Sequence, residues 1–161
     1  MKIAIYPGTF DPVTNGHLDV LSQALTIFDQ VMVAVALNVE KRPMFSVEER
    51  VAMFEQSVDG WTGVSVLSSE TLTVDLATRL NAQAVIRGVR SATDLEKEAE
   101  MAMMNRRLEP SLTTVSFFPG ERAVYVSSSL VKEVFYFGGD ISDHVPTPVL
   151  KALSEKRNQV N

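Results

Sequence analysis

The chain has 161 residues, a length that suits one domain with a complete hydrophobic core. Its net charge of -5 argues against a general nucleic-acid surface, so any site for a polyanion must be a local cluster of basic residues. The absence of cysteine excludes disulfides, thiolate metal sites and cysteine nucleophiles. Because no apolar run reaches membrane-spanning length and the amino terminus has the pattern of a strand rather than a signal peptide, we expect a cytoplasmic protein without a membrane partner.

The amino-terminal residues predict a strand, a loop and the start of a helix. An apolar run at 3–6 is followed by the glycine and proline residues of a turn at 7–12. Leucines and a phenylalanine spaced by three and four residues then predict a helix that begins near His17. A helix N-terminus favours an anion, because it carries unpaired N–H groups and the positive end of the helix dipole. His17 adds a directed N–H donor there, and the alternative is a surface His17 behind a helix cap at Thr14 or Asn15.

The rest of the chain alternates between strand and helix. We expect further strands at 31–37, 64–67, 84–86 and 113–118, and helices at about 46–58, 73–80, 93–108 and 127–138, with a short polar C-terminal helix that has Pro146 and Pro148 at its start. Capping boxes mark two helix starts, Ser46 with Glu49 and Thr93 with Glu96. This alternation predicts a single domain over residues 1–161, of the α/β class. We expect a doubly wound, Rossmann-like fold, with a five-stranded parallel sheet and helices on both faces.

Polar and basic residues follow the carboxyl ends of four predicted strands. In a doubly wound sheet, ligands bind at that edge, near the point where strand order reverses. The residues are Thr9, Asp11 and His17 after the first strand, Lys41 after the second, Arg87 and Arg90 after the fourth, and Ser127, Ser128 and Ser129 after the fifth. Each alone could be a solvated charge, an ion-pair partner or a helix cap, but together they predict a phosphate-binding site.

The chemistry at this edge favours one kind of reaction. No base–nucleophile pair is evident, which suits a phosphoryl-type transfer in which positioning and charge neutralisation do most of the catalysis. The sequence has no G-x-x-x-x-G-K-[ST] motif, so it is not a P-loop NTPase. It has no G-x-G-x-x-G after the first strand, which disfavours a nicotinamide-dependent dehydrogenase.

Four segments resemble a known family. Residues 6–12 followed by Thr14-Asn15-Gly16-His17 resemble the first signature of the nucleotidyltransferase superfamily, and residues 127–132 resemble its second signature. Together with residues 41–45 and 86–90, they resemble the bacterial phosphopantetheine adenylyltransferases over nearly the whole chain. The resemblance implies that ATP and 4'-phosphopantetheine react, with Mg²⁺, to give dephospho-coenzyme A and pyrophosphate in coenzyme A biosynthesis. It also implies an in-line attack on the ATP α-phosphate, a homo-oligomer that is typically a hexamer, and feedback inhibition by coenzyme A.

The resemblance also implies roles for individual residues. His17 would stabilise charge on the reacting α-phosphate, and Lys41 and Arg90 complete the implied catalytic set. Thr9 would contact both substrates, and phosphopantetheine would be held by Lys41, Thr73 and Arg87. The implied ATP site consists of Thr9, Phe10, His17, Gly88, Val89, Arg90, Glu98, Ala123, Val124, Tyr125, Val126, Ser127, Ser128 and Ser129. No residue is assigned as a metal ligand.

Three questions stay open at this point. The chain could be another member of the superfamily, either a cytidylyltransferase or a nicotinamide-mononucleotide adenylyltransferase. It could also belong to another class, as a non-catalytic nucleotide-binding module. Finally, Met101, Met104 and Leu108 lie at helical spacing and form an apolar face that is either part of the core or an interface between subunits.

Overall fold

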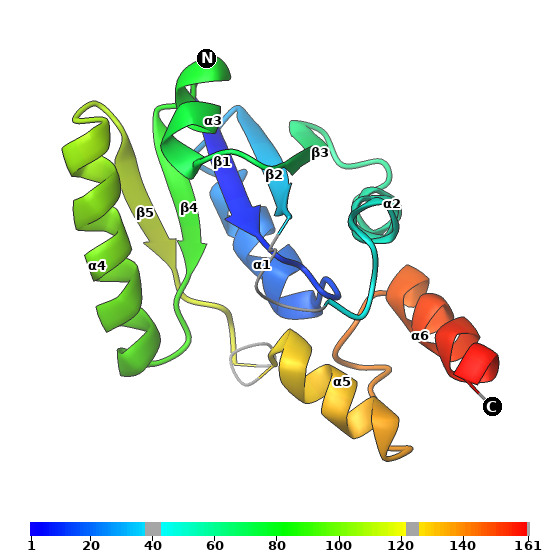
Figure 1. Cartoon of the computed structure of the whole chain (residues 1–161). Coiled ribbons are helices and arrows are strands. Elements are labelled where there is room, and N and C mark those ends of the chain that lie inside the picture. Colours follow the sequence, from blue (N-terminus) through cyan, green and yellow to red (C-terminus); the bar gives the residue numbers. More distant parts are fainter. Residues whose placement is uncertain (38–42, 122–125, 161) are drawn as a thin grey trace.

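The structure is a computed structural model and describes residues 1–37, 43–121 and 126–160 (Figure 1). The strands are β1 (Ile3–Gly8), β2 (Gln30–Ala36), β3 (Val64–Ser69), β4 (Ala84–Gly88) and β5 (Thr113–Phe117). The helices are α1 (Asn15–Ala24), α2 (Val47–Ser57), α3 (Thr73–Arg79), α4 (Ala92–Leu108), α5 (Ser128–Tyr136) and α6 (Thr147–Val160). The predicted elements are all present, and the bounds predicted for them differ from the observed bounds by at most two residues.

The strands form one parallel sheet in the order β3-β2-β1-β4-β5. The chain runs outward from β1 through β2 to β3, then returns to place β4 on the other side of β1 and continues to β5. Strand order therefore reverses between β1 and β4, the position at which α/β sheets bind ligands. The predicted fold class, a doubly wound Rossmann-like α/β fold, is confirmed.

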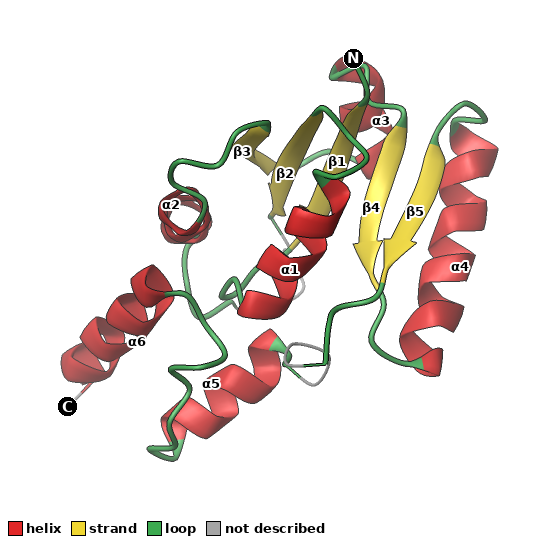
Figure 2. Ribbon diagram, turned by 180° about the vertical axis from the view of Figure 1, so that it is seen from behind, coloured by secondary structure: helices red, strands yellow, loops and turns green. Residues whose placement is uncertain are grey.

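Helices cover both faces of the sheet, and the alternation of side chains along β1 shows which helices share a face. Ala4 and Tyr6 belong to a large hydrophobic cluster that includes residues of α1 and α2 and continues into α5 and α6. Ile5 points to the opposite face and packs with Val74 and Ala77 of α3. Figure 2 shows α1 lying across the sheet, with α5 and α6 beyond the carboxyl ends of the strands.

The helix starts show one prediction that is correct and one that is wrong. At α2, the Ser46–Glu49 capping box is present, with Glu49 N–H donating to Ser46 Oγ at 3.2 Å. At α4, the expected box of Thr93 and Glu96 is wrong, because Ser91 is the N-cap and accepts from the N–H of Asp94 at 3.1 Å. The same spacing pattern occurs two residues earlier, so the helix begins there.

The apolar face of α4 does not belong to the core of this chain. None of the residues of α4 is buried. Met101 is 55% exposed, Met104 54% and Leu108 56%. The interface alternative for this face remains a prediction. No helix in the described ranges is both long enough and apolar enough to cross a membrane.

Candidate active site

A cavity of about 610 Å³ lies at the carboxyl ends of the strands, where β1 and β4 meet. Its walls come from β1 and the loop that follows, the start of α1, the end of β4, the first turns of α4, and the first turn of α5. Among the predicted site residues, those that line it are Thr9, Phe10, His17, Arg87, Gly88, Arg90, Glu98, Val126, Ser127, Ser128 and Ser129. The cavity is therefore at the expected place, and segments far apart in the sequence meet there.

The remaining predicted residues are placed differently. Val89 is buried and does not line the cavity; its N–H donates to the carbonyl of Phe117 at 2.9 Å, which fixes the backbone beside Gly88. Thr73 lines a second, smaller cavity of about 50 Å³, which shares Pro7, Arg87 and Glu98 with the main cavity. The other four predicted residues lie outside the described residues: Lys41, Ala123, Val124 and Tyr125.

His17 lies in the first turn of α1, and its hydrogen bonds define its protonation state. The backbone N–H of Thr14, the N-cap of α1, donates to Nδ1 of His17 at 3.0 Å. Burial lowers the pKa of His17 to about 4, and the charge of Arg90 acts in the same direction. At neutral pH the ring is therefore uncharged, and because Nδ1 accepts, the proton resides on Nε2. The helix start thus presents one neutral N–H donor from this side chain.

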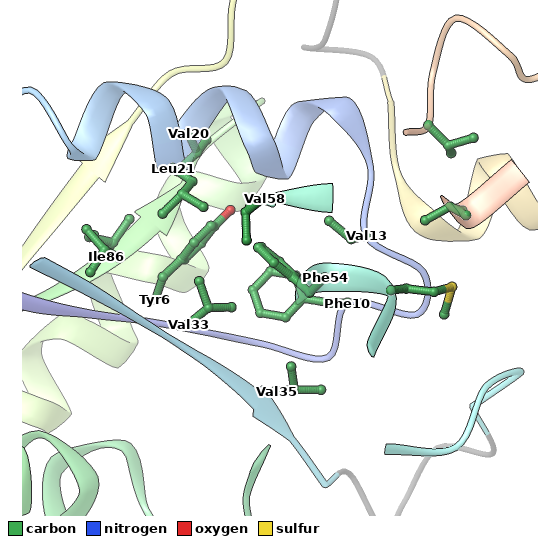
Figure 3. Close-up of a cluster of buried hydrophobic side chains, with 14 of the residues drawn as sticks. Tyr6, Phe10, Val13, Val20, Leu21, Val33, Val35, Phe54, Val58 and Ile86 are labelled. Atoms are coloured by element: carbon green, nitrogen blue, oxygen red, sulfur yellow. The ribbon is translucent and has the colours of Figure 1, made fainter. Parts of the chain in front are cut away.

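Phe10 anchors the loop between β1 and α1 in the core. Phe10 is 3% exposed, and its ring makes edge-on contacts with Tyr6 and Phe54 at centroid distances of 5.2 and 4.9 Å (Figure 3). It makes a third edge-on contact with the ring of His17, at 5.0 Å. Phe10 has a φ of 48°, an uncommon conformation for a bulky side chain, so the surrounding contacts must hold it. The ring also leaves no room at Gly8, where an added Cβ would lie 2.7 Å from Cζ of Phe10.

Asp11 joins three segments of the chain instead of facing a phosphate. Its carboxylate accepts from the N–H of Met44 and the N–H of Phe45, both at 2.9 Å, and from Nζ of Lys132 at 2.7 Å. Burial alone would raise the pKa of Asp11, but these donors outweigh it and hold the pKa below its ordinary value. Asp11 therefore stays ionised and ties the loop after β1 to the residues before α2 and to α5.

Two further ion pairs orient the arginines that follow β4. Glu98 receives two hydrogen bonds from Arg87, at 2.5 and 2.6 Å, and Arg87 also donates to the carbonyl of Pro7 at 2.9 Å. Arg90 lies 3.5 Å from the carboxylate of Asp94 and donates to the carbonyl of Val126 at 3.1 Å. Arginine forks held in this way are pre-organised for phosphate oxygens.

Sequence reasoning assigned no role to Asp94 or Lys132, although both line the cavity. For Lys132, its position in the second signature segment is a signal. For Asp94, the Ser91-x-x-Asp94 spacing marks a helix start close to the arginines. The partners themselves could not be inferred, since the residue that pairs with Lys132 is 121 positions away.

The N-terminus of α5 contributes a second set of polar groups to the cavity. Ser127 caps the helix by accepting from the N–H of Leu130 at 3.0 Å, and Ser128 Oγ donates to the carbonyl of Pro12 at 2.7 Å. Two helix N-termini, those of α1 and α5, therefore border one cavity and both favour an anion there.

The described residues do not form a metal cage. Within the described ranges, no group of three or more His, Asp or Glu side chains could hold a metal ion. The carboxylates that line the cavity are Asp11, Asp94 and Glu98, and each already pairs with a basic side chain. These carboxylates therefore orient basic side chains of the protein at the cavity.

Comparison with known proteins identifies the family. The protein-family model described as "Cytidylyltransferase-like" matches residues 5–134. The chain is 49% identical over 156 residues to "Phosphopantetheine adenylyltransferase" of Desulfosudis oleivorans, which covers 97% of this chain and 93% of that protein. A protein of the same name from Opitutus terrae is 50% identical, and the match covers 95% of this chain and 96% of that protein. Another from Alkaliphilus metalliredigens is 46% identical, and the match covers 97% of this chain and 99% of that protein. At this identity and coverage, the chain belongs to the phosphopantetheine adenylyltransferase family, within the nucleotidyltransferases.

Proposed function

We propose that the main cavity binds ATP and 4'-phosphopantetheine side by side and transfers the adenylyl group of ATP to the phosphate of phosphopantetheine, giving dephospho-coenzyme A and pyrophosphate. The chain thereby catalyses a step of coenzyme A biosynthesis, in keeping with its family. One observation carries the assignment of the catalytic centre: His17 lies at the N-terminus of α1, with its Nδ1 accepting from the N–H of Thr14, in the cavity that Arg90 also lines.

The reaction needs no nucleophile or general base from the protein. A phosphate oxygen of phosphopantetheine, already ionised at neutral pH, forms a bond to the α-phosphorus of ATP. The bond from that phosphorus to the bridging oxygen of the β-phosphate breaks, and pyrophosphate leaves with the electron pair. Negative charge shifts onto the oxygens of the α-phosphate and the leaving group, so directed donors accelerate the step. The proposed donors are Nε2–H of His17, the guanidinium group of Arg90, and Lys41, which lies outside the described residues.

The two substrates divide the remaining residues between them. ATP is proposed to lie against Thr9, Phe10, Gly88, Arg90, Glu98 and residues 123–129, with the buried Val89 supporting the wall beside Gly88. Phosphopantetheine is proposed to contact Thr9, Lys41, Thr73 and Arg87. The shared wall of the two cavities supports this division, because Arg87 borders both and Thr73 lines the smaller one. Arg87 would then hold the phosphate, while the part of the substrate remote from the phosphate extends toward Thr73.

Magnesium, if carried by the nucleotide, does not require a protein cage. Mg²⁺ commonly binds substrate phosphates and keeps several waters, and the paired carboxylates of the cavity suit that arrangement better than direct ligation. When bound, Mg²⁺ would neutralise part of the phosphate charge. We therefore propose no residue of the chain as a metal ligand.

Assembly, regulation and location are proposals drawn from the family resemblance. A homo-oligomer, most simply a hexamer, would cover the exposed apolar side chains of α4. Coenzyme A contains both an adenine nucleotide and a phosphopantetheine group, so one molecule could occupy both subsites and inhibit the enzyme. A cytoplasmic location suits a chain without cysteine, since no disulfide requires an oxidising compartment.

The direct test is a pyrophosphate-release assay with the purified chain. Phosphopantetheine with ATP should give turnover well above that of phosphopantetheine with CTP or nicotinamide mononucleotide with ATP. Preference for CTP, or for nicotinamide mononucleotide, would assign the chain to one of the other superfamily activities. ATP binding without turnover of any pair would favour the non-catalytic module.

A further inference from the structure

Arg50 is a buried arginine that the proposed mechanism does not use. It lies in the first turns of α2 and is 1% exposed. Among the residues that the structure describes, no carboxylate lies within ion-pair distance of its guanidinium group. Arginine is almost never fully buried without a partner, because removing its charge from water is costly. The contacts that stabilise it here should therefore indicate what it does.

Backbone carbonyls take the place of a carboxylate around Arg50. Nη1 donates to the carbonyl of Thr9 at 2.6 Å and to the carbonyl of Ala36 at 2.9 Å. Nε donates to the carbonyls of Phe45 and Ser46, at 3.2 and 3.3 Å. These carbonyls belong to three segments: the loop after β1, the end of β2, and the residues that lead into α2. A planar fork with fixed donor directions can hold these segments in one mutual orientation, which a flexible ammonium group cannot do.

The contact with Thr9 also fixes the direction of a neighbouring donor. The peptide between Thr9 and Phe10 is trans, and in a planar trans peptide the C=O and the N–H point in opposite directions. Because Arg50 holds the Thr9 carbonyl on the buried side, the N–H of Phe10 points away from Arg50. In the described chain no acceptor is paired with this N–H, and both Thr9 and Phe10 line the main cavity.

We propose that Arg50 is a positioning residue for the nucleotide site: it orients the Thr9–Phe10 peptide so that the N–H of Phe10 donates to a phosphate oxygen of ATP. This inference rests on the proposed function for the identity of the nucleotide. The left-handed backbone of Phe10 makes the peptide dependent on such a clamp, since a bulky residue does not adopt that conformation readily. A purely structural role would stabilise the fold equally well but would not affect what the Phe10 amide binds.

The test follows the Phe10 amide by NMR in the complete chain labelled with [¹⁵N]phenylalanine. The Phe10 resonance is identified as the one that is missing from the spectrum of Phe10→Leu. In the wild type, ATP with magnesium chloride should move this resonance strongly. Arg50→Met keeps the apolar stem and removes the donors, so the movement should be lost and the Kd for ATP should rise about 10- to 100-fold. Arg50→Lys, which can reach some of the carbonyls, should give intermediate values of both.

Leu153→Ala serves as the control for lost stability alone. Leu153 is fully buried in α6 and does not line the cavity, so this variant should unfold more easily but keep the response of Phe10 to ATP. The proposal is overturned if Arg50→Met has the same shift of the Phe10 resonance and the same Kd for ATP as the wild type. It is also overturned if ATP does not move the Phe10 resonance of the wild type. Should Arg50→Met fail to fold, wild-type values in Arg50→Lys would overturn it instead. Turnover is measured separately: an inactive wild type contradicts the proposed function, whereas the response of Phe10 to ATP still decides the role of Arg50.

Discussion

The loop between β1 and α1 and the helix α4 both border the main cavity, but they hold their side chains in opposite ways. In the loop, Phe10, Asp11, Val13 and Thr14 are at most 5% exposed. In α4 none of the residues is buried, and Met103 is 67% exposed. The loop is enclosed by its own chain, whereas most side chains of α4 are exposed.

This difference separates side chains whose orientation is set by contacts within the chain from side chains that another subunit could cover. The orientation of His17 and Phe10 depends on contacts within the chain, so it should be the same in a monomer and in an assembly. Contiguous exposed apolar side chains on a helix are typical of an interaction surface. Glu98, which orients Arg87, lies one turn before that apolar face, so covering α4 would also stabilise the phosphopantetheine side of the cavity.

The largest effect should come from a charge on the exposed face of α4. If that face is an interface, Met104→Asp buries an unpaired carboxylate, which costs about 3–5 kcal/mol, and the oligomer should dissociate. Arg106→Asp, exposed on the side of α4 opposite Met101, Met104 and Leu108, is the matched control. Light scattering at micromolar concentration measures the mass. A monomeric mass for the wild type contradicts the hexamer, and a hexamer that survives Met104→Asp places the interface elsewhere.

Next in size is His17→Ala, which removes the donor from the enclosed loop region. Loss of one pre-organised donor at a developing charge costs about 2.7–4 kcal/mol, so kcat should fall 10²- to 10³-fold while ATP binding changes little. Steady-state kinetics and calorimetry with ATP measure the two quantities. His144→Ala, at the exposed second histidine, should leave both unchanged. A near-normal kcat in a folded His17→Ala protein would exclude the assigned role.

The same contrast explains which features could be predicted from the sequence. Local patterns sufficed for the strands and helices, because buried parallel strands are continuous apolar runs and the helices show regular apolar spacing. The alternation of strands with helices also predicted that the cavity lies at the carboxyl-end edge of the sheet. The residues of the loop after β1 were predicted to be near the ligand, and Thr9, Phe10 and His17 do line the cavity.

Contacts between distant segments could not be predicted. Asp11 follows β1 as the phosphate-binding candidates do, but its carboxylate is occupied by Lys132 and two backbone N–H groups. Arg50 lies at helical spacing from the apolar Val47 and Phe54, but that spacing does not show that carbonyls of three separate segments surround its guanidinium group. Whether the methionines of α4 are buried depends on what packs against that helix, and helical spacing alone carries no such information.

A pair of substitutions separates the two substrate sites. Arg90→Ala should raise the KM for ATP, and Lys41→Ala the KM for phosphopantetheine, each about 10- to 100-fold because a charge-assisted hydrogen bond to phosphate is lost. The expected selectivity follows from their origin in loops after different strands. Initial rates with one substrate varied at a time measure it, and the exposed Arg106→Ala is the control. If both variants fail only with ATP, the division into two substrate sites is wrong.

A smaller effect, on the free energy of unfolding, is expected at Gly8. An alanine Cβ would lie 2.7 Å from the ring of Phe10, which is itself held by three aromatic neighbours and cannot retreat freely. Overpacking of this kind costs roughly 1–3 kcal/mol, so Gly8→Ala should lower the free energy of unfolding by that amount. Urea denaturation measures it. In Gly120→Ala the nearest atom to the new Cβ is at 4.0 Å, so that variant should unfold like the wild type.

The smallest effect concerns Asp11 and depends on pH. Since its pKa in the folded chain is below the ordinary value, the stability it contributes is present above that ordinary value and is lost as the pH falls through the folded pKa. Asp11→Asn keeps one acceptor oxygen but loses the charge that binds Lys132, so unfolding at pH 7 should cost roughly 1–2 kcal/mol less.

The pH dependence distinguishes this contribution from a general loss of packing. As the pH is lowered below about 4, the wild type should lose the contribution of Asp11, and the difference between wild type and Asp11→Asn should shrink toward zero. Urea denaturation at several pH values measures both curves, with Asp59→Asn in an exposed turn as the control. A difference that stays constant down to pH 3 would mean that the carboxylate charge of Asp11 does not hold the three segments together. The loop would then be held by the aromatic contacts of Phe10 and by the hydrogen bonds of Arg50 to Thr9 and of Ser128 to Pro12.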